Sequence, residues 1–375
     1  MGPDHVGILL NSSMFRGIPT RRTGQESINN YEEVAKEFDL IPCFLRLGDI
    51  DLKQGKCIAY IYNGREYTKA IIPIPKVIHN RALYSDPAAH RNVVQLISQG
   101  TTVFNANNRY RKDLIHKLLW NNKYLRSYLP VSVPATSSGL QQMMELYSDL
   151  ILKPVRGSVG HGIIRLRKGT KGWESIHYSS RQKSWSKARL SPGDLPQWLG
   201  RLLVRTPYFI QERIPLLEYN NRPLDLRVTV QKGMNGTWNV TGLFAKVAPS
   251  NSFISNIAKG GTAYPAPVLL GNLLPAPIVA GVLAHVKSLS LSIASELSAN
   301  LPQLADLGLD IGLTDNGRPY FIECNGRDQR YGFRKAGMTN IWKDTYRTPI
   351  AYARYLLNHP KRTESPIHKI TSKFD

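Results

Sequence analysis

The chain has 375 residues, more than one ordinary hydrophobic core holds, so we expect two or three domains. Its 42% hydrophobic and 20% charged residues are typical of a globular protein and exclude a low-complexity chain. The 49 Lys and Arg against 27 Asp and Glu give a net charge of +22, which favours anionic partners such as nucleotides, nucleic acid or acidic peptides. The basic residues are spread along the chain, so charge alone does not select among these partners.

Neither the cysteines nor the apolar runs indicate an exported or membrane protein. Cys43, Cys57 and Cys324 form no CxxC pair, so we expect no disulfide scaffold or zinc site and a reducing, cytoplasmic compartment. The apolar stretch Val6–Leu10 is too short for a signal peptide core. The longest apolar run, Leu273–Ala284, contains two prolines and is shorter than the roughly 20 residues of a membrane span.

The first 108 residues alternate short apolar runs with helical stretches, a pattern that predicts a small three-layer α/β domain. The expected strands are Val6–Leu10, Cys57–Tyr62, Ala70–Ile74 and Val77–His79, and the expected helices are Ile28–Phe38 and Pro87–Ser98.

The rest of the chain divides into a helical segment, a strand-rich segment and a long helix. Residues 109–148 have helical spacing, strongest at Asp113–Tyr128. The later elements are strands at Leu150–Lys153, Ile163–Leu166, Tyr208–Gln211, Leu224–Gln231 and Trp238–Val247, a helix at Ile278–Leu297, a hairpin at Leu307–Asn325 and a helix at Ile350–Leu357. We expect domains at 1–108, 109–208 and 209–360, with a loose tail at 361–375.

The hairpin Leu307–Asn325 carries the strongest chemical signal. Asn316-Gly317 predicts a two-residue turn, because the favoured turn needs positive φ at both central positions. The resulting register has an apolar face, with Leu309 opposite Cys324, Ile311 opposite Ile322 and Leu313 opposite Tyr320, and a polar face, with Asp310 opposite Glu323 and Gly308 opposite Asn325.

Two carboxylates directly opposite each other, about 5 Å apart, are destabilising unless a cation lies between them. Asp310 and Glu323 therefore predict a hard divalent cation, and Mg²⁺ shared with substrate phosphates is the commonest such case. Gly308 and Gly312 are expected to leave room for the ligand. The alternative is a surface hairpin whose acidic face pairs with lysines.

Residues 150–165 read as a strand, a glycine-rich loop and a second strand. Gly157, Gly160 and Gly162 match neither the Walker pattern nor GxGxxG, so they predict a flap whose backbone N–H groups can approach phosphate oxygens. Lys153 adds a positive charge at the end of the strand. The alternative is a flap without a ligand.

Two further strands place charged residues on one face. If Asn235-Gly236 makes the turn, Asp225 lies opposite Lys246 and Arg227 opposite Phe244. Arg227 and Lys246 then share a face and are suited to neutralising a transferring phosphoryl group. The alternative is an ordinary cross-strand ion pair, which contributes little at a surface.

In this order, the segments resemble the ATP-grasp superfamily over about residues 110–330. With the IHNR segment (78–81), they are most similar to the YheC/YheD group of endospore coat-associated ATP-grasp proteins. The resemblance implies an N-terminal α/β pre-ATP-grasp domain followed by two α+β subdomains that clamp ATP between them. It is carried by Lys117 on a helix, LKP with Lys153, RGSVGHG, QERI (211–214), DLRV with Arg227, Lys246, NIAKGG (256–261), LDIG with Asp310, and IECN with Glu323 and Asn325.

The resemblance also implies roles for individual residues. Asp310, Glu323 and Asn325 would hold Mg²⁺, expected as two ions, with Mn²⁺ able to substitute. Lys112 is an alternative to Lys117, because the register of that helix is open. The implied ATP-binding residues are Lys117 and Lys153 at the phosphates, Arg156, Gly157, Ser158, Val159 and Gly160 in the flap, Gln211, Glu212, Arg213 and Ile214 at adenine, and Glu218 at ribose.

For catalysis, Arg227 and Lys246 would stabilise the γ-phosphoryl group and an acyl-phosphate, and Asn256 and Lys259 would close over the reacting carboxylate. Asn80 and Arg81 are weaker substrate-binding candidates that hint at an anionic acid. The alternative for this pair is a strand end with a solvent-facing arginine.

The implied function is an ADP-forming carboxylate–amine ligase that joins a small-molecule or peptide acid to an amine, in the cytoplasm or at the forming endospore. A catalytically silent nucleotide-binding protein of the spore coat is the main alternative, and a phosphotransferase on the same scaffold is another. Nucleic-acid binding rests on charge alone, since no recognition motif is present. The sequence leaves the acid, the amine and the oligomeric state open.

Overall fold

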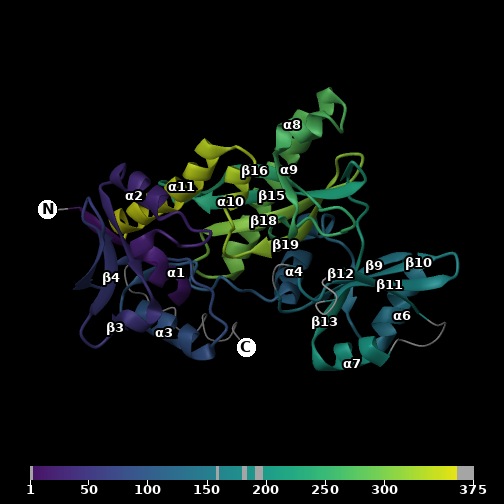
Figure 1. The fold of residues 1–375 in the computed structure, drawn as a ribbon, viewed down its shortest axis with the longest axis horizontal. Coiled ribbons are helices and arrows are strands. Elements are labelled where there is room, and N and C mark those ends of the chain that lie inside the picture. Colours follow the sequence, from purple (N-terminus) through teal and green to yellow (C-terminus); the bar gives the residue numbers. More distant parts are fainter. Residues whose placement is uncertain (1–2, 158–159, 180–183, 191–196, 361–375) are drawn as a thin grey trace.

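Three β-sheets organise the chain in the computed structural model, which describes residues 3–157, 160–179, 184–190 and 197–360 (Figure 1). The predicted flap residues Ser158 and Val159 and the predicted tail 361–375 lie outside the described residues. We call the three sheets the N-terminal sheet (β1–β7), the flap sheet (β8–β13) and the central sheet (β14–β19).

The N-terminal sheet confirms the predicted α/β character of the first segment. Its order is β3-β4-β2-β1-β6-β7, with β5 beside β4, and β1 pairs in parallel with both β2 and β6. Helices α1 (Ser12–Gly17), α2 (Ile28–Lys36) and α3 (Pro87–Ser98) accompany it. The strands are β1 (Asp4–Leu9), β2 (Leu40–Leu45), β3 (Ile50–Asp51), β4 (Lys56–Tyr62), β5 (Tyr67–Pro73), β6 (Val77–Asn80) and β7 (Thr102–Phe104).

The flap sheet is antiparallel, in the order β12-β11-β10-β9-β13-β8. Helices α6 (Ser137–Leu146) and α7 (Gln197–Arg205) belong to the same part of the chain. Strands β11 and β12 were not predicted, because their polar sequences offer no apolar strand signal. The strands are β8 (Ser132–Pro134), β9 (Asp149–Pro154), β10 (Ile164–Gly169), β11 (Gly172–Ser179), β12 (Ser184–Arg189) and β13 (Tyr208–Glu212).

The central sheet lies between the other two sheets in Figure 1, in the order β17-β16-β15-β18-β19, with β14 beside β15. Its apolar face packs against α9 (Ala276–Asn300) and α4 (Lys112–Asn121). The strands are β14 (Glu218–Tyr219), β15 (Arg222–Lys232), β16 (Trp238–Val247), β17 (Thr262–Pro265), β18 (Asp306–Leu313) and β19 (Pro319–Asn325), and the smaller helices are α5 (Lys123–Arg126), α8 (Ala266–Gly271) and α10 (Tyr331–Lys335).

Helix α9 is longer than the sequence indicated. Pro277 lies in its first turn, where a missing N–H is tolerated, so the helix continues to Asn300. In the described part of the chain it is the one helix long and apolar enough to cross a membrane, and 33% of its most apolar window is buried. Val286, Leu289 and Ile293 are buried in the core of the central sheet, as in the core helix of a globular domain.

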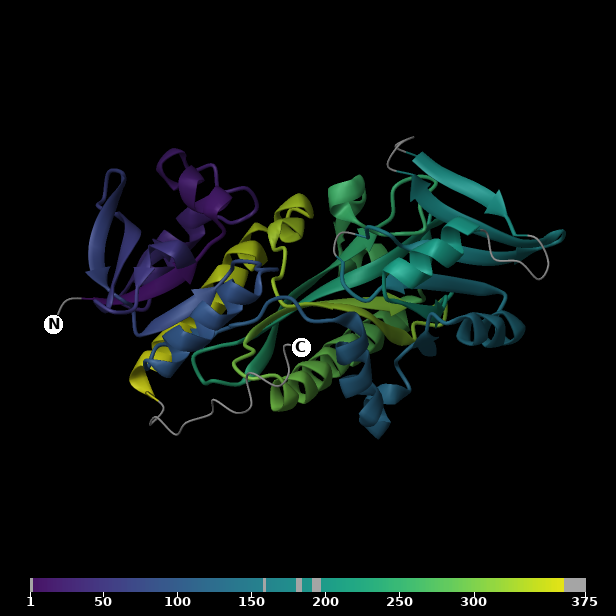
Figure 2. The same ribbon diagram turned by 90° about the horizontal axis from the view of Figure 1, so that it is seen from below.

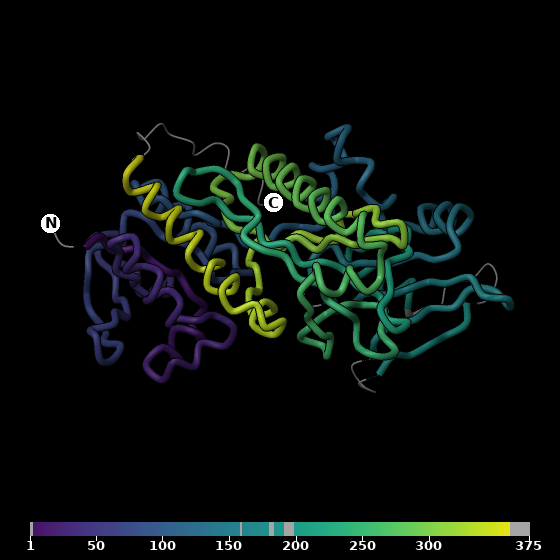
Figure 3. The backbone as a smooth tube through the Cα atoms, turned by 90° about the horizontal axis from the view of Figure 1, so that it is seen from above, coloured from purple at the N-terminus to yellow at the C-terminus, as the bar shows by residue number. Residues whose placement is uncertain are grey.

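Helix α11 (Thr339–Asn358) returns the end of the chain to the N-terminal sheet, as the yellow helix beside the purple segment shows in Figures 2 and 3. Tyr346 and Ile350 are fully buried in one cluster with residues of β1 and α2. The sequence predicted only the last part of this helix, because Pro349 interrupts its pattern. The carbonyl of Thr345, which Pro349 cannot bond, accepts a hydrogen bond from Gln231 Nε2 at 2.9 Å.

The hairpins β15–β16 and β18–β19 have the predicted strand pairing near the site, but their loops are longer than predicted. Both loops have five residues, 233–237 and 314–318, and only the glycine of each Asn-Gly pair has positive φ. A bulge after Thr229 and another after Asp310 compensate for the longer loops. The predicted Asp225–Lys246, Arg227–Phe244 and Asp310–Glu323 pairs are therefore confirmed, whereas two were wrong: Ile311 pairs with Phe321, and Leu313 with Pro319.

Candidate nucleotide- and metal-binding site

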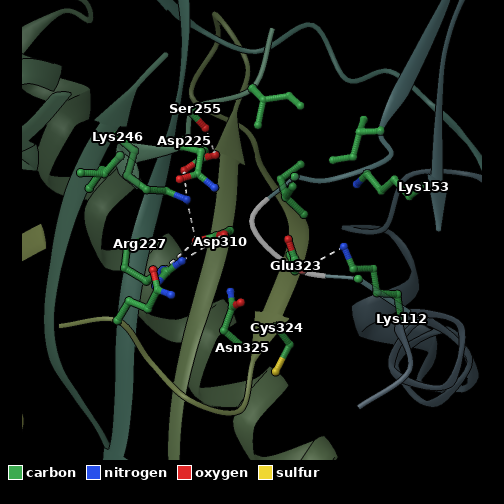
Figure 4. A pocket seen from close by; sticks show the side chains of 18 of the residues that line it. Lys112, Lys153, Asp225, Arg227, Lys246, Ser255, Asp310, Glu323, Cys324 and Asn325 are labelled. Atoms are coloured by element: carbon green, nitrogen blue, oxygen red, sulfur yellow. Dashed lines mark hydrogen bonds and ion pairs between the residues drawn. The ribbon is translucent and has the colours of Figure 1, made fainter. Parts of the chain in front are cut away.

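A cavity of about 280 Å³ lies where the flap sheet faces the central sheet. One wall comes from β9, β13 and the segment that follows β13, and the opposite wall from β15, β16, β18 and β19. Leu83 and Asn108 of the N-terminal part also line it. Figure 4 shows Lys153 and Lys112 across the gap from Asp310 and Lys246.

Lys153 is a buried cation on the flap-sheet wall. Its Nζ donates a hydrogen bond to Gln211 Oε1 at 2.6 Å, and 9% of the residue is exposed. Burial, together with the charge of Lys112, lowers the pKa of Lys153 to about 8. No carboxylate of the described residues lies within ion-pair distance of Lys153. An anionic ligand would therefore stabilise its charged form.

Lys112, rather than Lys117, lies at the cavity. Lys112 begins α4, lines the cavity and forms an ion pair with Glu323 Oε1 at 3.0 Å. Lys117 is exposed and does not line the cavity. The two positions are five residues apart, about 140° around the helix axis, so they cannot present their side chains to the same ligand.

The predicted acidic hairpin forms the floor of the opposite wall. Asp310 is buried and accepts from Arg227 Nε at 2.7 Å and from Lys246 Nζ at 2.9 Å. Burial raises the pKa of Asp310, but Arg227 and then Lys246 outweigh it and hold that pKa well below its usual range. Arg227 and Lys246 thus offset the repulsion that the hairpin register predicts between Asp310 and Glu323, and Lys112 pairs with Glu323.

The donor set fits a hard divalent cation. Asp310 and Glu323 are paired across β18 and β19, and Asn325 follows on the same side of the cavity. The buried Nδ2 of Asn325 has no hydrogen-bond partner among the described residues, and amide N and O assignments are interchangeable. In the described residues no group of three or more His, Cys, Asp or Glu could hold a metal, so phosphate and water would have to complete the shell.

The two glycines beside Asp310 do not leave room for a ligand, which corrects the prediction. A Cβ at Gly308 would lie 2.3 Å from Asp328 Oδ1, and one at Gly312 would lie 2.4 Å from Leu216. Gly308 admits Asp328, whose carboxylate accepts from Arg227 Nη1 at 2.9 Å and from Thr229 Oγ1. The two glycines therefore admit neighbouring side chains, of which Leu216 lines the cavity.

Asp225 is a second buried carboxylate of this wall. It forms an ion pair with Lys246 at 2.9 Å and accepts a hydrogen bond from Ser255 (Figure 4). Burial raises the pKa of Asp225 to about 6, although Lys246 opposes the shift. Lys246 thus lies between Asp225 and Asp310, and its ion pairs with both carboxylates fix the position of its ammonium group.

The structure brings most of the predicted adenine-side residues to the cavity. Gln211, Glu212, Arg213 and Ile214 line it, with Gly157 and Gly160 of the flap. Glu218 and Arg156 are exposed and do not line it. Leu216 and Ile322 add apolar surface that the sequence analysis missed; the bulge after Asp310 places Ile322 on the cavity side.

The loop that carries Asn256 and Lys259 reaches the flap. Asn256 lines the cavity and caps the short 3₁₀ helix Ile257–Lys259 by accepting from Ala258 N. Lys259 does not line the cavity; its Nζ donates to the carbonyl of Gly160 at 3.3 Å. Lys259 therefore joins this loop to the glycine-rich flap.

Asn80 and Arg81 do not line the cavity; Asn80 ends β6, as the alternative expected, but Arg81 is buried rather than solvent-facing. Arg81 is 1% exposed, with Nη2 2.6 Å from Glu26 Oε1 and Nη1 3.2 Å from Asp306 Oδ2. Asn80 donates to the carbonyls of Asn105 and Ala106. Both residues are structural, and the sequence could not show this because their partners are distant in the chain.

Two sheets that clamp a basic cavity, a glycine-rich flap on one and an acidic hairpin on the other, define the ATP-grasp fold. The model of the YheC/D-like ATP-grasp family matches residues 100–356, and the chain belongs to this family. The resemblance and the fold class predicted from the sequence are thereby confirmed.

Relatives and solved structures agree with this assignment. Endospore coat-associated protein YheD of Bacillus subtilis strain 168 is 24% identical, over 82% of this chain and 68% of its own length. YheC of the same strain is 21% identical, over 86% of both chains.

The ATP-grasp ligase PsnB, solved with a minimal precursor, superposes with a TM-score of 0.53 at 15% identity, over 94% of this chain and 99% of its own. D-alanyl-alanine synthetase A of Vibrio cholerae has a TM-score of 0.51 at 15% identity, over 100% and 99%. At this identity these two structures establish the shared fold.

Proposed function

We propose that the chain is a Mg²⁺-dependent, ADP-forming ligase that joins a carboxylic acid to an amine through an acyl-phosphate. One observation carries the proposal: Asp310 and Glu323 face each other inside a cavity, each held by cations, with the buried Lys153 across the gap. A purely structural role leaves Lys153 unexplained, because this buried cation has no carboxylate within ion-pair distance among the described residues, and buried charges are costly unless they are used or paired.

The binding roles follow from position. Lys112 and Lys153 would contact the phosphates, and Ile214, Leu216 and Ile322 would form the apolar surface for adenine. Asp310, Glu323 and Asn325 would hold Mg²⁺, which neutralises phosphate charge when bound.

The reaction needs positioning and charge rather than a side-chain nucleophile. An oxygen of the acid attacks the γ-phosphorus of ATP, ADP leaves, and the amine then attacks the acyl carbon and releases phosphate. The guanidinium of Arg227 and the ammonium of Lys246 both pair with Asp310. They would stabilise the negative charge that develops on the transferred phosphoryl group. The relatives named as endospore coat-associated support a place for this ligase at the forming spore.

The test is ADP formation with hydroxylamine as the amine and a panel of acids. We expect Mg²⁺-dependent hydroxamate, and we expect Asp310→Asn and Glu323→Gln to lower the rate roughly 100-fold or more. Asp315→Asn, an exposed carboxylate in the turn of the same hairpin, is the matched control and should keep the rate.

A second candidate, a nucleotide-binding structural protein, is favoured only by the coat-associated names of the relatives. Tight Mg–ATP binding with no turnover across the panel would support it and would contradict a ligase. Full activity in Asp310→Asn would show that the metal assignment is wrong.

A further inference from the structure

Arg327 is a cation of the cavity that the proposed nucleotide and metal roles do not use. It follows β19 directly, two residues after Asn325, and lines the cavity half-buried. Its Nη1 donates to Asn11 Oδ1 and to the carbonyl of Arg81, both at 3.3 Å. Its Nε and Nη2 make no hydrogen bond to any residue that the structure describes.

Arg327 also lacks a counterion among the residues that the structure describes. Within residues 3–157, 160–179, 184–190 and 197–360, no carboxylate lies within 4.0 Å of its guanidinium. The nearby carboxylate of Glu26 is held by Arg81, and Asp328, the next residue, is held by Arg227 and Thr229. Burial, followed by the charge of Arg81, lowers the pKa of Arg327, so its charged form is under-compensated.

The charge balance of the whole cavity points the same way. Its described lining contains seven basic residues, Arg109, Lys112, Lys153, Arg213, Arg227, Lys246 and Arg327, and four acidic ones, Glu212, Asp225, Asp310 and Glu323. ATP with two Mg²⁺ ions is close to neutral, so it leaves the excess of positive charge in place. A substrate with more than one negative charge would balance it.

The position of Arg327 in the fold is where a substrate is expected. Strands β1 and β6 are parallel neighbours in the N-terminal sheet. The chain adds β2 on one side of β1 and β6 on the other, so the strand order reverses between β1 and β6. Ligands of open parallel sheets bind beyond the carboxyl ends of the strands at such a switch point. Asn11 follows β1, and Arg81 and Leu83 follow β6; Leu83 lines the cavity, and Arg327 contacts the other two.

We propose that Arg327 binds a second carboxylate of the acid substrate, so that the enzyme selects dicarboxylic acids or acidic peptides over their half-amides. The reacting carboxylate would lie at Arg227 and Lys246, and the second would lie toward β1 and β6, where the guanidinium has free donors. This inference rests on the proposed function. It assigns to Arg327 the anion recognition that the sequence had suggested for Arg81.

The experiment separates binding from turnover. Succinate, glutarate, L-aspartate, L-glutamate, Ala-Asp and Ala-Glu are each compared with a partner in which one carboxylate is an amide. Binding is measured calorimetrically with Mg–ADP present, and turnover as hydroxamate formation with ATP and hydroxylamine.

We expect at least one dicarboxylate to bind about tenfold or more tightly than its half-amide, the strength of one charge-assisted hydrogen bond. Arg327→Gln should remove this difference in affinity, because it should weaken binding of the dicarboxylate and leave binding of the half-amide unchanged. Arg327→Lys should keep part of the difference in affinity. Arg91→Gln, an exposed arginine on α3 outside the cavity, should behave as wild type. Unchanged Mg–ADP binding shows that each variant is folded.

The inference is overturned if Arg327→Gln discriminates as wild type does. It is also overturned if no dicarboxylate of the panel binds while Mg–ADP binds normally. Binding that depends on Arg327 without any hydroxamate would instead contradict the proposed ligase and leave the carboxylate site standing.

Discussion

At the scale of single residues, we expect the position of each lysine to decide whether it contributes to nucleotide affinity. Lys112 faces the cavity from the first turn of α4, and Lys117 points to solvent from the same helix. We expect Lys112→Met to weaken Mg–ADP binding roughly 10- to 100-fold, the loss of one charge-assisted hydrogen bond. Lys117→Met should leave the Kd unchanged in isothermal titration calorimetry. Equal losses in both variants would mean that the effect is one of net charge rather than contact.

We expect Lys153 to make nucleotide binding pH-dependent. Because burial lowers its pKa to about 8, the lysine of the free protein loses its proton as pH rises from 7 to 9, and a phosphate then meets a neutral amine. The affinity for Mg–ADP should therefore fall over this range. Lys153→Arg should flatten the profile, because arginine stays protonated. A wild-type Kd that is constant from pH 7 to 9 would contradict this role.

At the scale of elements, the two bulged hairpins shape the wall of the site. In β18, the side chains of Leu216 and Ile322 pack against the backbone of Gly312. A Cβ added at Gly312 would lie 2.4 Å from Leu216 Cδ2 and 3.2 Å from Ile322 Cδ1. Gly312→Ala should destabilise the fold by about 1–3 kcal/mol through overpacking and weaken adenine-nucleotide binding. Gly271→Ala, at the end of α8 with no atom within 4 Å, is the control. Urea unfolding and Mg–ADP titration of both variants test this; a neutral Gly312→Ala contradicts the packing.

The elements show how far sequence reasoning reached. The period-two pattern and the Asn-Gly pairs predicted both hairpins, and the pairs nearest the site were correct. The loops were not two-residue turns, and the register held only because a bulge offset each longer loop. Bulges leave little local signal, since the extra residue is chosen by what it packs against. Ile322 was therefore assigned to the wrong face.

At the scale of the whole molecule, a buried ionic network joins the N-terminal sheet to the central sheet and α10. Asp306 is fully buried and accepts from Arg81 and Arg330, and His79 Nε2 lies 3.3 Å from it. Such networks contribute less to net stability than to a unique arrangement, but removing one partner costs about 3–5 kcal/mol.

His79 makes this junction sensitive to acid. Burial lowers its pKa to about 4, below the value of about 6.5 that an unfolded chain has. Between these two values the unfolded chain binds a proton that the buried imidazole does not. The free energy of unfolding is therefore highest above pH 6.5 and falls by on the order of 3 kcal/mol as the pH falls toward 4. The urea midpoint of the wild type should fall across this window, and His79→Gln should show a shallower fall. The same slope in both proteins would place the acid sensitivity elsewhere.

The sequence by itself determined the ATP-grasp class and the pairing of Asp310 with Glu323, and it indicated the glycine-rich flap and segment 211–214, because these depend on local spacing and turn chemistry. Only the tertiary structure decided which lysine of α4 faces the cavity, and that Arg81 is buried whereas Arg327 has no counterion in the part of the chain that the structure describes. These outcomes depend on partners 55 to 247 residues away, such as Glu26 and Asp328 around Arg81. The acidic pair Asp310 and Glu323 is thus one side of a larger, strongly basic cavity.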